Sequence, residues 1–246
     1  MRKETDLWQV KATARAMLML DIGETDFSPM IVKHPFTDSG ITAIPKPDGG
    51  IQMLTLMDSP SDLKRWRDFM SQSIEQAQSA YEIYMMVTKP YGLTFLKFVS
   101  PHLSQGDLSN ILSSAWTRSE APNQDVNVSK AKLLAIFKAA DPSSLMDEED
   151  LKQFRELEDT VTVYRGVTSW NADNVKALSW TLDRETAEWF AHRFGEGGTV
   201  YEAQISKDHI YAYFGGRNEA EVIVDPKHLM DITEVQDIDN GFQMTM

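Results

Sequence analysis

Three short polar clusters near the carboxyl end of the chain carry residue types that can do chemistry together. Arg165 is a permanent cation, Ser179 and Thr181 are two hydroxyls, and Glu219 and Glu221 are two carboxylates. The members of each pair are separated by one residue, so in an extended segment they share a face. A guanidinium fork suits phosphate oxygens, and a carboxylate can stabilise a developing positive charge. The clusters together predict one polar site assembled from three segments.

Each cluster lies in or beside a segment that favours a strand. Val161–Tyr164 precedes the arginine, 177–181 contains the hydroxyls, and Val222–Val224 follows the carboxylates. Residues 183–191 predict a helix, for which Thr181 or Asp183 can serve as the cap. We therefore expect strand ends and loops to hold the three clusters, with one helix directly after the second cluster.

The order of these clusters resembles the ADP-ribosyltransferase superfamily, in the branch whose motif is Arg, then Ser-x-Thr or Ser-x-Ser, then Glu-x-Glu. Tyr164 supplies an aromatic residue before the arginine, Gly166 follows it, and Trp180 fills the middle of Ser-x-Thr. The resemblance covers roughly the last ninety residues well and the preceding helical stretch loosely, and none is seen before about Thr88. It implies that NAD is consumed as a substrate and that no metal takes part.

The resemblance also implies a role for each motif residue. Glu221 would be the catalytic carboxylate and Ser179 would position it, with Thr181 supporting the same strand. Glu219 would activate the acceptor, and in the family this first glutamate commonly accompanies transfer to arginine side chains. Arg165 would anchor the dinucleotide.

Three further residues would contact the substrates. Gly166 would offer backbone groups to the nicotinamide amide. Tyr213 and Phe214 precede the Glu-x-Glu loop and would touch the nicotinamide or the acceptor. The chain has no Gly-x-Gly-x-x-Gly or Walker-type loop, so a dinucleotide site here would be of the non-Rossmann kind.

The function expected from this resemblance is that of a mono-ADP-ribosyltransferase acting on a macromolecule, most often a protein arginine. RNA or DNA remains possible as the acceptor. An NAD glycohydrolase would use the same residues with water as the acceptor, and a catalytically inactive binding module would keep the fold alone. A bacterial toxin, a phage enzyme and a defence effector all fit these residues, and a toxin would imply an antitoxin or immunity partner.

Composition limits the remaining possibilities. The 246 residues include no cysteine, which excludes disulfides and thiolate metal sites, and the five histidines show no metal-ligand spacing. The chain opens without the apolar core of a signal peptide and has no apolar run of membrane-spanning length, so we expect a cytoplasmic protein with no membrane partner. A secretion route that uses no cleavable signal stays open. The net charge of −13 disfavours non-specific binding to nucleic acid.

The expected fold class is α+β. We expect residues 1–87 to form an N-terminal extension with a helix, a β-hairpin and a long helix over about 58–81. Residues 88–246 would form the ADP-ribosyltransferase domain. Its helical lobe would span 88–158, and its β-rich catalytic core would span 159–246, with two packed, mostly antiparallel sheets around an NAD cleft.

Overall fold

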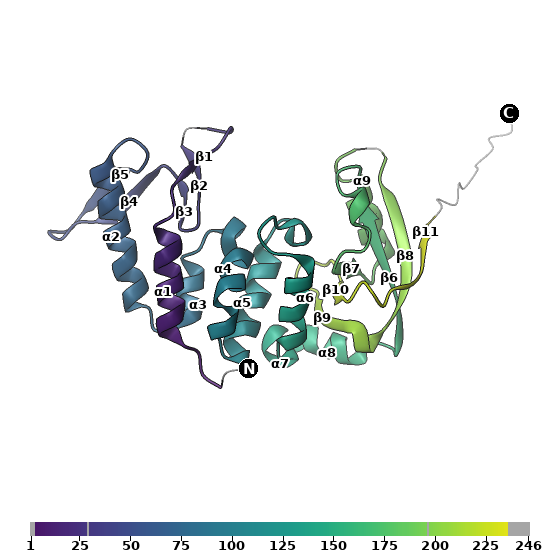
Figure 1. The fold of residues 1–246 in the computed structure, drawn as a ribbon. Coiled ribbons are helices and arrows are strands. Elements are labelled where there is room, and N and C mark those ends of the chain that lie inside the picture. The colour runs from purple at the N-terminus through teal and green to yellow at the C-terminus, as the bar shows by residue number, and fades with distance from the viewer. Residues whose placement is uncertain (1–2, 29, 196, 236–246) are drawn as a thin grey trace, which may run out of the picture. The chain divides into compact units, whose positions relative to one another are not determined.

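The computed structural model describes residues 3–28, 30–195 and 197–235, and it divides the chain into two compact units, Met1–Leu145 and Met146–Met246 (Figure 1). The expected boundary at 87/88 falls inside the first unit. There α3 (Ala80–Met85) packs on α5 (Gln105–Arg118) across that position. The expected helical lobe is therefore divided: residues up to 145 join the first unit, and α8 (Glu148–Glu156) joins the β-rich unit.

The first unit is mainly helical, with two small antiparallel sheets of order β1-β2-β3 and β4-β5. Its other α-helices are α1 (Leu7–Leu18), α2 (Pro60–Gln76), α4 (Gly92–Val99), α6 (Lys130–Ala139) and α7 (Pro142–Leu145). Its strands are β1 (Gly23–Glu24), β2 (Ile31–His34), β3 (Thr37–Ser39), β4 (Ile41–Pro45) and β5 (Ile51–Thr55), and its 3-10 helices are η1 (Lys89–Tyr91), η2 (Ser100–His102) and η3 (Pro122–Gln124).

The long helix expected near 58–81 is wrong in one respect, because the structure forms two helices there. Ala77 leaves helical geometry at φ −57° and ψ 135°, and α3 starts three residues later. The Ser79 hydroxyl accepts a hydrogen bond from the backbone N–H of Glu82, and the Glu82 carboxylate accepts one from the N–H of Gln78. These two contacts cap the start of a new helix.

The second unit builds one six-stranded sheet with a helix on each side. Its strands are β6 (Thr160–Val167), β7 (Ser179–Thr181), β8 (Thr199–Ser206), β9 (Ile210–Phe214), β10 (Glu221–Val224) and β11 (Met230–Glu234). Between them lie α9 (Arg184–His192) and the 3-10 helices η4 (Ala172–Asn174) and η5 (Lys207–His209). No helix among the described residues of the chain is long and apolar enough to cross a membrane.

The sheet has the order β11-β8-β6-β7-β10-β9, and every pairing in it is antiparallel. The α+β class is thus confirmed, but the two expected sheets are joined as one. The junction is narrow: β6 and β7 pair only at Tyr164 and Thr181, whereas β6 pairs with β8 along its whole length from Thr160 to Val167. One residue pair is enough to make the ladder continuous, although β6 and β7 part beyond it.

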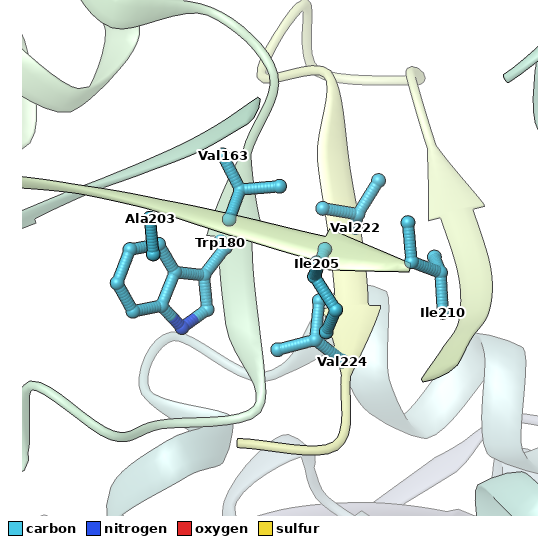
Figure 2. Close-up of a cluster of buried hydrophobic side chains, with 7 residues drawn as sticks. All are labelled: Val163, Trp180, Ala203, Ile205, Ile210, Val222 and Val224. Atoms are coloured by element: carbon cyan, nitrogen blue, oxygen red, sulfur yellow. The ribbon is translucent and has the colours of Figure 1, made fainter. Parts of the chain in front are cut away.

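A compact apolar core fills one face of this sheet (Figure 2). Its buried members come from five strands or their ends: Val163, Trp180, Ala203, Ile205, Ile210, Val222 and Val224. Phe154 of α8 and Leu157 just beyond it pack against this cluster. The alternation of side chains along each strand therefore turns Tyr164, Thr181 and Glu221 to the opposite face.

Candidate active site

Arg165 lies where β6 and β7 part, one residue beyond their single pairing. Its Nε–H donates to the carbonyl oxygen of Asn174 at 3.2 Å, and its Nη1 donates to the carbonyl oxygen of Ser179 at 2.6 Å. The side chain thus ties η4 to β7. Burial lowers the pKa of Arg165 to about 10, and the nearby negative charge of Glu221 acts to raise it. The guanidinium therefore stays charged at neutral pH beside the second glutamate of the motif.

Glu221 opens β10 and is buried, with 6% of its surface exposed. It pairs with Thr181 of β7 on one side and with Phe214 of β9 on the other. Ser179 pairs with Ile223, so its side chain lies on the same face as Glu221 and diagonal to it. The register therefore brings Ser179, Thr181 and Glu221 to one face of neighbouring strands.

The two hydroxyls of Ser-x-Thr have different surroundings. The Thr181 Oγ1 donates to the carbonyl oxygen of Glu219 at 2.6 Å and accepts from the N–H of Asp183 at 3.0 Å. It thereby connects the Glu-x-Glu loop to the start of α9. Ser179 has no side-chain hydrogen bond to any part of the chain that the structure describes, which leaves its hydroxyl available near Glu221.

Glu219 is not related to Glu221 by strand geometry, contrary to the expectation for an extended run. Ala220 between them has φ +43°, and Asn218 before them has φ +56°, both in the left-handed region. Strand β10 consequently begins only at Glu221. The Glu219 side chain is 23% exposed, against 7% for that of Glu221, so one carboxylate is more accessible and the other is enclosed.

Arg217 brings the two carboxylates together in spite of the turned backbone. Its Nη2 lies 2.9 Å from Oε2 of Glu219 and 3.9 Å from Oε2 of Glu221. The Arg217 side chain remains 47% exposed. The result is a cluster of alternating charge in which Glu221 lies close to two guanidinium groups, those of Arg217 and Arg165.

Gly166 has a packing role in this structure. A Cβ built on it would lie 2.0 Å from the carbonyl oxygen of Ala187 and 2.6 Å from the nitrogen of Ala191, both in α9. Gly198 makes the same kind of contact, with a hypothetical Cβ 1.8 Å from the oxygen of Ala191. Helix α9 therefore rests directly on the backbone of β6 and of the segment before β8.

The two aromatic residues before the Glu-x-Glu loop separate to opposite faces. Phe214 pairs with Glu221 and shares its face, whereas Tyr213 pairs with Val222 and packs against the apolar core. Burial raises the pKa of the Tyr213 phenol, and the negative charges of Asp150 and Glu149 raise it further. Of the pair, Phe214 is therefore the one beside the carboxylates.

Sequence reasoning missed three participants in this site. Asn174 gives Arg165 a carbonyl partner, Asp150 Oδ1 accepts from the N–H of Gly215 at 2.9 Å, and Arg217 binds the carboxylates. No sequence signal marks Asn174, because its backbone makes the contact. Arg217 could have been found, since it is a cation two and four residues before the two glutamates in a Gly-Gly turn.

Comparison of the chain with protein-family models, curated proteins and solved structures finds no match. The chain is an α+β protein of two units. The second unit carries a cluster of two carboxylates, two guanidinium groups and two hydroxyls, on neighbouring strands of an antiparallel sheet and on the loop before β10.

Proposed function

We propose that the chain is a mono-ADP-ribosyltransferase, which cleaves the nicotinamide–ribose bond of NAD and transfers ADP-ribose to a guanidinium group of a macromolecule. One observation carries the proposal. The three motif segments, which are separated in the sequence, lie on the adjacent strands β6, β7 and β10, with the buried Glu221 near Arg165 and on the face of Ser179.

The environment of Glu221 fits the proposed chemistry. Loss of nicotinamide leaves an oxocarbenium-like ribose, which a fixed negative charge in a water-poor site stabilises more strongly than one in water. Glu221 is such a charge, since the strands on both sides enclose it. Arg165 would serve the diphosphate with the N–H groups that η4 and β7 do not use.

The acceptor side of the proposal depends on Glu219. This carboxylate is more exposed than Glu221, as a base for an incoming macromolecule must be. It already binds a guanidinium at 2.9 Å, that of Arg217. A site that holds one guanidinium against a carboxylate has the charge and the geometry to receive another, which favours arginine over the phosphate-rich surface of a nucleic acid.

The test measures nicotinamide release and label incorporation from NAD in the same samples, with agmatine and with cell lysate as acceptors. We expect Glu221→Gln to reduce both signals by at least ~100-fold, because a transition-state charge partner is lost. Glu219→Gln should suppress transfer while slow hydrolysis of NAD continues, since only the base for the acceptor is removed.

Glu156→Gln is the matched control, because Glu156 is an exposed glutamate at the end of α8 in the same unit. It should retain both signals. Nuclease-sensitive label in lysate would make the arginine assignment wrong, and release of nicotinamide without any transfer would indicate a glycohydrolase. An absence of nicotinamide release from the unaltered protein would refute the proposal as a whole.

A further inference from the structure

The loop that carries Arg217 is held at both ends. On the β9 side the N–H of Gly215 donates to Asp150 at 2.9 Å, and the N–H of Asn218 closes a turn on the carbonyl of Gly215 at 2.8 Å. On the β10 side the carbonyl of Ala220 accepts from the N–H of Leu182 at 3.0 Å. Arg217 therefore emerges from a defined backbone, and its position does not depend on a free loop tip.

The guanidinium of Arg217 occupies the place that the proposed reaction assigns to its acceptor. Nη2 is within hydrogen-bond distance of the carboxylate proposed as the base, at 2.9 Å from Glu219 Oε2. The same nitrogen is 3.9 Å from the carboxylate proposed to face the ribose, that of Glu221. A nucleophile in this position is close both to its proposed base and to the carboxylate proposed to stabilise the ribose cation, as a transfer step requires.

We propose that Arg217 is an acceptor of ADP-ribose within its own chain, an inference that rests on the proposed function. In this step Nη2 attacks C1′ of the ribose that carries nicotinamide in NAD. The N–C1′ bond forms as the bond from C1′ to the nicotinamide nitrogen breaks. The electron pair of the broken bond leaves with nicotinamide, which departs neutral. The proton of Nη2 passes to Glu219 and then to water, and NAD is the only co-reactant.

An ordinary ion pair is the competing explanation for the contact. Exposed arginines often form ion pairs that contribute little to stability, so the contact with Glu219 alone does not require Arg217 to take part in a reaction. The two explanations differ in one measurable consequence. An ion pair leaves Arg217 unmodified during turnover, whereas an internal acceptor gains ADP-ribose at a rate that does not depend on the concentration of the protein.

The experiment incubates the full chain with labelled NAD and no added acceptor. The chain is then digested with a protease that does not cleave at arginine, and the ADP-ribosylated residue is identified by fragmentation that preserves the sugar linkage. We expect the label on the peptide containing Arg217. Arg217→Lys should lower self-labelling by at least ~10-fold, because the lysine ammonium lacks the guanidinium nucleophile held between the two carboxylates.

Arg193→Lys is the matched control, since Arg193 is an exposed arginine of the same unit that stacks on Phe190 and Phe194. It should retain the label. A differently sized, inactive Glu221→Gln chain mixed with the unaltered protein should stay unlabelled if the step is intramolecular, and equal labelling of the two chains would overturn that step. Nicotinamide release with no label on Arg217 would overturn the inference and leave the proposed function standing, whereas no release at all would refute the proposed function first.

Discussion

Replacement of Gly166 by alanine tests whether this glycine serves the packing of α9. The added Cβ would lie 2.0 Å from the oxygen of Ala187, and ordinary contact begins near 3.4 Å, so the helix would have to retreat by about 1.4 Å. Both contacting atoms belong to backbone and cannot rotate away. Overpacking of this kind typically costs ~1–3 kcal/mol, and we expect a loss of about 3 kcal/mol here because a helix must move.

Calorimetric melting provides the measurement. For a unit of about one hundred residues, a loss of 1 kcal/mol lowers the melting temperature by roughly 4–8 °C, so Gly166→Ala should melt at least roughly 10 °C lower than the unaltered protein. Gly216→Ala is the control, because a Cβ on Gly216 meets nothing within 4 Å. Equal melting of the two variants, with NAD affinity lost only in Gly166→Ala, would refute the packing argument and support the expected nicotinamide role.

Three further predictions concern single side chains. Arg165→Ala should weaken NAD binding by at least ~10-fold in titration calorimetry. Arg165→Lys should restore only part of the affinity, because a point charge does not reproduce the guanidinium fork. Unchanged affinity in Arg165→Ala would remove the residue from the proposed site. Burial lowers the pKa of His34 to about 4, so between pH 6.5 and pH 4 the unfolded chain binds a proton that the folded chain does not bind. This contribution to stability is complete above about pH 6.5, and the free energy of unfolding should fall by about 2 kcal/mol between pH 7 and pH 5 in urea titrations. His34→Leu should reduce this dependence of the unfolding free energy on pH. Thr181→Val removes the hydroxyl that binds the carbonyl of Glu219 and the N–H of Asp183 and should lower the free energy of unfolding by ~1–3 kcal/mol, whereas an unchanged urea midpoint would show that these contacts contribute nothing.

Local signals in the sequence predicted many of the elements around the site. Asp183 caps α9 through both of its carboxylate oxygens, as a short polar side chain before a helix indicates. The β-rich run from Ile210 to Phe214 forms β9. These elements depend on neighbours in the sequence, which is why the sequence reveals them.

Features that depend on distant contacts were not predictable in the same way. The junction of β6 and β7 at one residue pair follows from the packing of the whole sheet, and so does the choice of one sheet over two. The left-handed backbone at Ala220 contradicts the preference of alanine. The Thr181 hydroxyl, which donates to the carbonyl of Glu219, and the N–H of Leu182, which donates to the carbonyl of Ala220, hold the backbone there. Strand β11 carries weak strand signals and is recognisable only because β8 pairs with it.

The two backbone contacts of α9 affect how any set of related sequences should be interpreted. No side chain fits at Gly166 or Gly198 while α9 packs against the backbone at these two positions. Both positions should therefore remain glycine in related chains that keep this packing, including chains that lack the proposed catalytic residues. Gly166 directly follows Arg165, so its invariance would look like part of the proposed catalytic signature, although helix packing alone would account for it. Under the proposed function, Arg165, Ser179 and Glu221 would be the residues that distinguish an active chain from an inactive one. A search pattern weighted on the glycine would find chains with this fold whether or not they keep those residues.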